Sequence, residues 1–267
     1  MTTRRRDREN TAASPTRHPR AAVIVLAAGA GRRVGRETSK VLLPLSGLPV
    51  LAWSLRTIFD LEVDRVVVVI RERDRGEVEG MLSRHFPGRA IDVVPGGSTR
   101  HGSEWNALTA IADPIDTGAV EVVAIHDAAR PLAGPDLFAS TIGTAAEHGG
   151  ALPVQDRSAL VSRDPSPLEG AEASPREGAE ASPLEGAEGR LVGVQTPQAF
   201  RAGPLLDAHR RAARDGFVGT DTASCVERYT DLEIHCVPST ARNLKITYPE
   251  DVALAEQLLS KLGLGLA

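Results

Sequence analysis

The stretch VIVLAAGAGRRVGRETSK, residues 23–40, decides the fold. Its first four residues are apolar and mostly β-branched, which is typical of a strand buried on both faces of a parallel sheet. Small residues follow at positions 27–31, where the backbone can approach a ligand and its N–H groups can face an anion. Two cations, Arg33 and Lys40, come next on a segment without apolar periodicity. The stretch therefore predicts a buried strand that ends in a binding site for polyphosphate.

Composition limits the class of protein. The chain has 267 residues, 42% of them hydrophobic, which is enough for one sizeable core. A net charge of −4 does not favour nucleic acid as a partner, and no apolar run approaches the roughly 20 residues of a membrane span. The two cysteines, Cys225 and Cys236, form no disulfide or metal framework. We therefore expect a cytoplasmic protein that binds neither nucleic acid nor membrane.

Strand and helix patterns alternate along the chain. Strands are expected at 23–26, 66–70, 91–94, 120–125, 193–196 and 234–237, and helices at 51–59, 75–85, from about 98, at 135–148 and at 249–262. This order predicts a Rossmann-like α/β fold, a mostly parallel sheet with helices on both faces. Ligands of such sheets bind beyond the carboxyl ends of the strands. Residues 27–31, the Gly96-Gly97 pair and Asp127 are therefore expected to meet at one edge.

Two segments stand apart from this alternation. Residues 1–20 are rich in Arg, Thr and Pro and lack the apolar core of a secretory signal, so we expect a disordered tail, with an organellar targeting peptide as the alternative. Residues 166–189 are three copies of an octapeptide that begins Ser-Pro and holds at most one large apolar residue. Such a repeat cannot build a core, and it predicts a flexible acidic insertion in an arm at 157–190. Residues 21–267 otherwise form one domain.

Two common phosphate-binding motifs do not fit the glycines at 29, 31 and 35. A Walker A loop requires a lysine directly after its last glycine, and Lys40 comes too late. A Rossmann fingerprint requires a third glycine where Val34 stands, and an acidic residue at the end of the next strand, where the chain has Arg71. Both interpretations fail on spacing.

A third pattern, L-A-A-G-x-G-x-R-x6-K over residues 26–40, resembles nucleotidyltransferases that join a nucleoside triphosphate to a sugar or polyol phosphate. Five more motifs follow in order: GGSTRHGS (96–103), HDAARP (126–131), QTPQ (195–198), TDTAS (220–224) and NLKITYPED (243–251). Together they resemble the 2-C-methyl-D-erythritol 4-phosphate cytidylyltransferase family over roughly residues 21–262, the repeat excepted. The resemblance implies the nucleotide-diphospho-sugar transferase fold, a homodimer and a step of the non-mevalonate route to isoprenoids.

The resemblance also implies roles for individual residues. A phosphate oxygen of the polyol attacks the α-phosphate of CTP and pyrophosphate leaves, so positioning groups and cations are needed rather than a nucleophile. The expected catalytic residues are Arg33, Lys40 and Lys245, and Lys245 is expected to lie on a strand. The expected nucleotide-binding residues are Ala27, Ala28, Gly29, Gly31, Gly97, Ser98, Arg100 and Ser103. The expected polyol-phosphate residues are Asp127, Arg130, Arg157, Thr196, Asp221 and Lys245.

Several of these residues have a second interpretation. Asp127 ends a buried strand, where a carboxylate needs a partner: either a Mg²⁺ held mainly by the triphosphate, which would be the cofactor, or Arg130. Ser103 is either a nucleotide contact or an ordinary serine of a first helical turn. Asp221 is either a substrate contact or a helix cap, and Arg100 faces the nucleotide or is structural.

The residues expected to bind the polyol phosphate, which accepts the cytidylyl group, depart from the family pattern. The family has threonine at the position of Arg157, and an arginine of its dimer-clasping arm falls on Glu188, with Arg190 two residues away. Two acceptors therefore stay open: 2-C-methyl-D-erythritol 4-phosphate, or another polyol phosphate such as ribitol 5-phosphate. A non-catalytic nucleotide-binding protein is the alternative from another class, and the presence of Arg33, Lys40 and Lys245 argues against it.

Overall fold

The computed structural model describes residues 18–29, 39–156 and 192–264 of the chain. Several predicted features lie outside these residues: the tail at 1–17, Gly31 and Arg33 of the first loop, Arg157, and the arm with its octapeptide repeat, Glu188 and Arg190. The predictions made for them are therefore not examined by the structure.

The centre of the fold is an eight-stranded sheet in the order β10-β7-β9-β6-β1-β4-β5, with β8 beside β7. Its strands are β1 (Ala21–Leu26), β4 (Arg65–Ile70), β5 (Asp92–Pro95), β6 (Val122–Asp127), β7 (Gly149–Asp156), β8 (Val192–Val194), β9 (Gln198–Arg201) and β10 (Glu233–Pro238). β1 is parallel to β4 and β6, β4 to β5, and β7 to β10, whereas β9 runs antiparallel between β6 and β7 and β8 antiparallel to β7. The mostly parallel sheet is confirmed.

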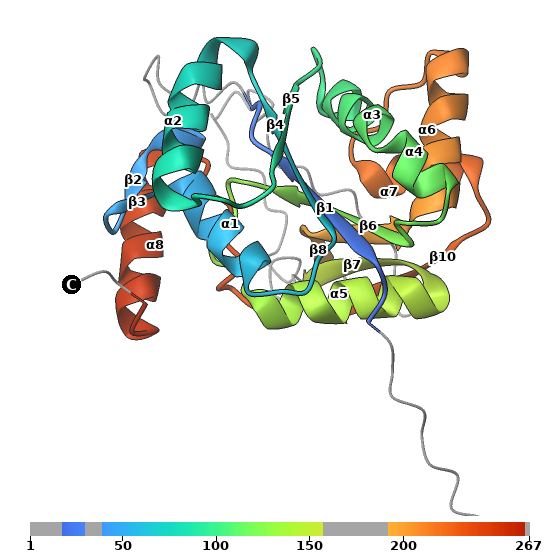
Figure 1. Ribbon diagram of the computed structural model, residues 1–267. Coiled ribbons are helices and arrows are strands. Elements are labelled where there is room, and N and C mark those ends of the chain that lie inside the picture. Colours follow the sequence, from blue (N-terminus) through green and yellow to red (C-terminus); the bar gives the residue numbers. More distant parts are fainter. Residues whose placement is uncertain (1–17, 30–38, 157–191, 265–267) are drawn as a thin grey trace, which may run out of the picture.

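Helices cover both faces of this sheet (Figure 1). They are α1 (Val50–Phe59), α2 (Arg75–His85), α3 (Arg100–Ala110), α4 (Ala112–Asp116), α5 (Pro135–His148), α6 (Ala202–Asp215), α7 (Thr222–Tyr229) and α8 (Pro249–Lys261). The first face carries α1, α2, α5 and α8, and the second carries α3, α4, α6 and α7. A short hairpin of β2 (Pro44–Leu45) and β3 (Leu48–Pro49) precedes α1. The strands and helices expected from the sequence include no counterpart of β7, β9, α4, α6 or α7.

Strand β1 divides its side chains between the two layers. Val23 and Val25 belong to the core beneath α1 and α5, and Ala22 and Ile24 to the core beneath α3 and α6. All four are fully buried. The period of two follows from the alternation of side chains along a strand, and it explains why every residue of this apolar run must be apolar. The prediction of a strand buried on both faces is confirmed.

The carboxyl ends of β1, β4, β5 and β6 lie at one edge of the sheet. The Ala27 amide donates to Val69 O at 2.7 Å and the Gly96 amide to Ile70 O at 2.7 Å. On the other side of β1, Leu26 is opposite Asp127, so β6 runs to Asp127 rather than ending at Ile125. The three predicted loops therefore meet. Among the described residues, no helix is both long and apolar enough to cross a membrane.

Candidate active site

Two loops of small residues lie against each other at this edge. A β-carbon placed on Gly96 would lie 2.5 Å from the Ala28 Cβ, and one on Gly97 would lie 2.6 Å from the Gly102 carbonyl carbon. Neither position has room for a side chain, so the loop after β5 packs with bare backbone on the loop after β1 at Gly96 and on the first turn of α3 at Gly97. Gly29, Gly97 and Ser98 are exposed, which leaves their backbone open to a ligand.

The loop after β5 is held in shape by the first turn of α3. Thr99 is the N-cap, and its hydroxyl accepts from the Gly102 amide at 3.0 Å. The buried Ser103 hydroxyl accepts from the Gly97 amide at 3.1 Å and donates to Thr99 O at 3.0 Å. Ser103 thus braces the loop, as a serine of a first helical turn can. A direct contact of Ser103 with a nucleotide stays a prediction.

Lys40 returns to the same edge from the start of a short 3-10 helix (Lys40–Leu42). Its Nζ donates to Ile246 O at 3.3 Å, and its Cε lies 4.0 Å from the place where a Gly29 β-carbon would stand. The side chain therefore joins the loop after β1 to the segment between β10 and α8. Two segments 206 residues apart in sequence meet at this lysine.

Asp127 connects two segments of the site through ion pairs. Its residue is 7% exposed, one carboxylate oxygen pairs with an Arg100 guanidinium nitrogen, and the other lies 3.0 Å from Lys245 Nζ. Burial alone would raise the pKa of this carboxyl, but Arg100, Lys245 and Arg130 outweigh burial and hold the pKa well below its ordinary value. Asp127 is therefore a carboxylate that binds cations from two separate segments.

Lys245 reaches Asp127 from a loop, and our expectation that it lies on a strand was wrong. Residues 239–248 carry no strand, and the Ile246 amide donates to Ala129 O at 2.7 Å. Arg130 donates from a guanidinium nitrogen to Asn243 O at 2.8 Å. These contacts attach the loop to the end of β6, so Lys245 is placed by backbone pairing next to Asp127 rather than by membership of the sheet.

Thr196 and Asp221 both have structural partners. Thr196 is buried, and its hydroxyl accepts from the Asp127 amide at 3.0 Å. Asp221 caps α7 by accepting from the Ser224 amide at 2.9 Å, and its second oxygen accepts from Gln198 Nε2 at 2.9 Å. The helix-cap interpretation of Asp221 is therefore supported, and substrate contacts of both residues stay predictions.

Glu104 is a neighbour of the site that the sequence analysis did not name. It is fully buried, and its Oε1 lies 3.0 Å from Arg100 Nε. A signal was present in the sequence, because Glu104 stands between Arg100 and Leu108 at helical spacing on the face that Leu108 buries. A carboxylate on such a face requires a cationic partner.

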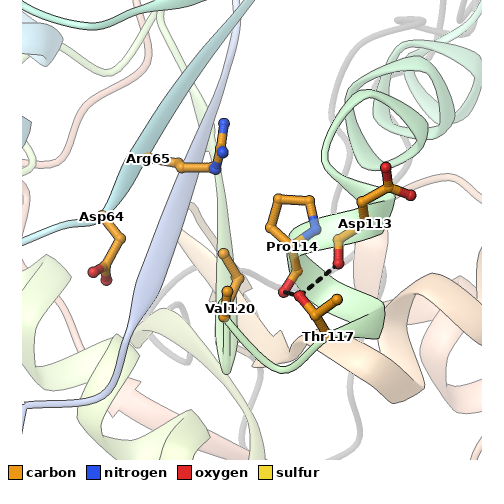
Figure 2. A pocket seen from close by; sticks show the side chains of 7 residues that line it. Asp64, Arg65, Asp113, Pro114, Thr117 and Val120 are labelled. Carbon is orange, nitrogen blue, oxygen red and sulfur yellow. Dashed lines mark hydrogen bonds between the residues drawn. The ribbon is translucent and has the colours of Figure 1, made fainter.

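A surface hollow at the opposite edge of the sheet does not coincide with these residues. It is lined by Asp64, Arg65, Asp113, Pro114, Thr117, Ala119 and Val120 (Figure 2). Arg65 begins β4 and Val120 precedes β6, so the hollow lies at the amino ends of parallel strands. The ligand rule for such sheets places the site at the carboxyl ends instead, where Asp127 and both lysines lie.

The sheet is mostly parallel and carries a loop of small residues, two lysines and a buried carboxylate at its carboxyl edge. This is the architecture of an α/β nucleotidyltransferase. The family model described as 2-C-methyl-D-erythritol 4-phosphate cytidylyltransferase matches residues 21–261, and the chain belongs to this family. The predicted family and the predicted enzyme class are confirmed.

Individual relatives agree with the family. The chain is 36% identical over 249 residues to the 2-C-methyl-D-erythritol 4-phosphate cytidylyltransferase of Solibacter usitatus, covering 89% of this chain and 95% of that protein. It is 37% identical over 245 residues to the protein of the same name from Symbiobacterium thermophilum, covering 90% and 92%. The crystal structure of the Thermus thermophilus cytidylyltransferase matches with a TM-score of 0.60 and 26% identity over 90% of this chain and 99% of that one. The synthase from Anaerococcus prevotii shares the fold, with a TM-score of 0.69 at 24% identity over 91% and 97%.

Gly97→Ala is expected to weaken CTP binding about tenfold, because the new methyl would lie 2.6 Å from backbone and the loop must move to admit it. Titration calorimetry with CTP measures the effect. Gly143→Ala in α5 is the matched control, since nothing lies within 4 Å of its added methyl. Equal CTP affinity in both variants would show that the nucleotide does not depend on the loop after β5.

Proposed function

We propose that the chain transfers the cytidylyl group of CTP to 2-C-methyl-D-erythritol 4-phosphate and releases pyrophosphate. The observation that carries this proposal is the meeting of Lys40, Asp127 and Lys245 beside the bare loops at 27–29 and 96–98, in a chain of this family. Anionic substrates need fixed cations and open N–H groups, and both are concentrated at this edge.

The reaction needs no covalent intermediate with the protein. A phosphate oxygen of the polyol attacks the α-phosphorus of CTP, the bond from that phosphorus to the bridging oxygen breaks, and pyrophosphate leaves with the electron pair. Lys40 is placed to neutralise charge that develops on the triphosphate, and Lys245 to hold a phosphate at the reacting end. Asp127 orients Lys245 through the 3.0 Å ion pair.

Magnesium is part of the same proposal. Mg²⁺ in phosphate-transfer sites commonly uses one or two carboxylates and takes its other ligands from phosphates and water. Asp127 is a suitable carboxylate, and because its oxygens face Arg100 and Lys245, the triphosphate would supply most of the ligands. When bound, the ion would neutralise charge on the triphosphate.

Assembly and location are also proposals. A homodimer is supported by membership of the family, because the resemblance implies a dimer-clasping arm at the positions of residues 157–190. A cytoplasmic location is supported by the two cysteines, Cys225 and Cys236, which are both free thiols. Light scattering coupled to size-exclusion chromatography measures the oligomeric state, and the mass of a single chain in solution would contradict the homodimer.

The decisive experiment measures pyrophosphate release from CTP with a panel of polyol phosphates, with and without EDTA. We expect release with 2-C-methyl-D-erythritol 4-phosphate, abolished by EDTA and restored by Mg²⁺. Release with ribitol 5-phosphate alone would replace the proposed acceptor. Bound CTP without release for any acceptor would favour a non-catalytic nucleotide-binding protein.

A further inference from the structure

Glu104 of α3 is the buried centre of a polar cluster behind the site. One oxygen, Oε1, lies 3.0 Å from Arg100 Nε and accepts from the Thr222 hydroxyl at 3.0 Å. The other, Oε2, lies 3.3 Å from His209 Nε2. Glu104 and His209 have side chains without exposed surface. A buried carboxylate is tolerated only when its oxygens are matched in this way.

His209 of α6 is suited to carry a positive charge. Its Nε2 faces Glu104, and its Nδ1 lies 3.1 Å from Leu205 O, so in the protonated ring both nitrogens donate to oxygen. Burial lowers the pKa of the imidazole, but contacts with Cys225 and Glu104 outweigh burial and raise the pKa to about 9. The imidazolium therefore neutralises part of the Glu104 charge at neutral pH.

These contacts form a row of alternating charges from the interior to the site. His209 meets Glu104, Glu104 meets Arg100, Arg100 meets Asp127, and Asp127 meets Lys245. Arg100 thus lies between two carboxylates, Glu104 and Asp127. How strongly Glu104 attracts Arg100 depends on the other groups that pair with Glu104. Without a cation at position 209, Glu104 would attract Arg100 more strongly and draw it from Asp127.

The same region contains three metal-ligating side chains, His101, His209 and Cys225, with ligand atoms within 4.8 Å of one another. The two imidazole rings are stacked, with centroids 4.8 Å apart and planes inclined by 9°. A metal bound by histidine lies close to the ring plane, and one ion cannot lie in two parallel planes. The arrangement therefore favours charge pairing over metal binding.

We propose that the buried Glu104–His209 pair positions Arg100, and through it Asp127 and Lys245, for binding of the nucleotide triphosphate. Glu104 and His209 touch no reacting atom in this proposal and act only through Arg100. The proposal rests on the proposed function for its kinetic readout, whereas CTP binding tests it without the acceptor.

The test compares Glu104→Gln, His209→Leu and His209→Gln. The first removes the charge and keeps the shape. The leucine removes both the charge and the donor at position 209, whereas the glutamine can still donate to Glu104. His235→Gln is the matched control, because His235 faces Glu233 at the same 3.3 Å on the surface. Val226→Ala, in the same core layer, is the control for lost packing alone.

We expect Glu104→Gln and His209→Leu to lower kcat/KM for CTP about 10- to 100-fold, mainly through KM, as displaced positioning groups do. The CTP Kd from calorimetry is expected to rise in parallel. His209→Gln should recover only a small part of the loss, because glutamine donates to Glu104 but carries no charge, and both controls should keep the wild-type KM even where Val226→Ala lowers Tm. If His209→Leu does not fold, Glu104→Gln decides alone, because it is isosteric.

Three outcomes would overturn the proposal. Wild-type KM and Kd for CTP in Glu104→Gln and His209→Leu, with a lowered Tm, would mean that the pair is only structural. A wild-type Kd for CTP in the uncharged His209→Gln would mean that the charge at position 209 does not hold Arg100 in place. One equivalent of zinc in the purified protein, lost in Cys225→Ser, would assign the cluster to a metal. Absence of pyrophosphate release in the wild type would contradict the proposed function, and the CTP Kd values would still test the positioning.

The charge at position 209 has a separate readout. The histidine faces Glu104 and His101 of α3 and Cys225 of α7, and its folded-state pKa lies above the ordinary value of 6.5. The stability that the charge contributes is then fully present below pH 6.5 and is lost as the pH rises through about 9. The difference in Tm between wild type and His209→Gln should shrink over that interval, and a constant difference would contradict a charged ring.

Discussion

Lys40→Ala is expected to lower kcat about 100- to 1000-fold, the usual effect of removing one fixed donor from developing charge in a transition state. Lys40 lies between the open loop at Gly29 and the segment of Lys245, where a triphosphate bound at the sheet edge would pass. The variant should fold normally, because the Lys40 side chain is only partly buried and lies outside the apolar core. Pyrophosphate release measures kcat, and thermal denaturation measures folding.

The chain provides its own control for this experiment. It has three lysines, at 40, 245 and 261, and the third is exposed in the last turn of α8. Lys261→Ala removes the same charge from the exposed end of α8, and this variant should keep the wild-type kcat. Near-normal kcat in Lys40→Ala would show that the triphosphate does not bind where we place it. Equal losses in both variants would point to net charge rather than to a specific contact.

The layers of the fold could be predicted because burial on two faces leaves a strong pattern. The run of β1 and the valines of β4 are apolar at every position, and Pro135 marks the start of α5 where a helix tolerates proline. Strand β9 was not predicted, since it has only four residues and lies directly between Pro197 and α6. Its antiparallel direction follows from pairing with β6 and β7, which no local pattern encodes.

The sequence predicted which loops form the site, but it did not predict which side chains pair with one another there. The meeting of three loops at Asp127 follows from sheet topology alone. The identity of its cationic partners does not, because Arg100 and Lys245 lie 27 and 118 positions away and the sequence favoured Arg130 or a metal. Glu104 and His209 are 105 residues apart, so only the packing of α6 on α3 brings the pair together.

Asp127→Asn is expected to cost both stability and activity. The substitution keeps the shape of the side chain but removes the carboxylate that meets both Arg100 and Lys245, from a residue that is only 7% exposed. Arg100 retains Glu104 as a partner. Removing one partner of a buried ion pair typically costs about 3 kcal/mol or more. For a chain of this size the loss corresponds to a Tm lower by roughly 10 °C. Activity should fall as well, because Lys245 is no longer held at the reacting end.

Two comparisons separate these effects. Asp74→Asn breaks a pair of similar burial, in which Asp74 meets Arg71 at 2.7 Å, and should lower Tm while leaving kcat/KM near the wild-type value. Asp127→Asn combined with Lys245→Met should regain part of the lost stability, since one of the two cations that met Asp127 is gone while Arg100 stays paired with Glu104, without regaining activity. The stability difference between wild type and Asp127→Asn should be fully present above pH 3.8 and should vanish only as the pH falls through the lowered folded-state pKa of Asp127. A difference that already disappears near pH 5 would mean that Asp127 is not held as a carboxylate by these cations, and its role in orienting Lys245 would have to be abandoned.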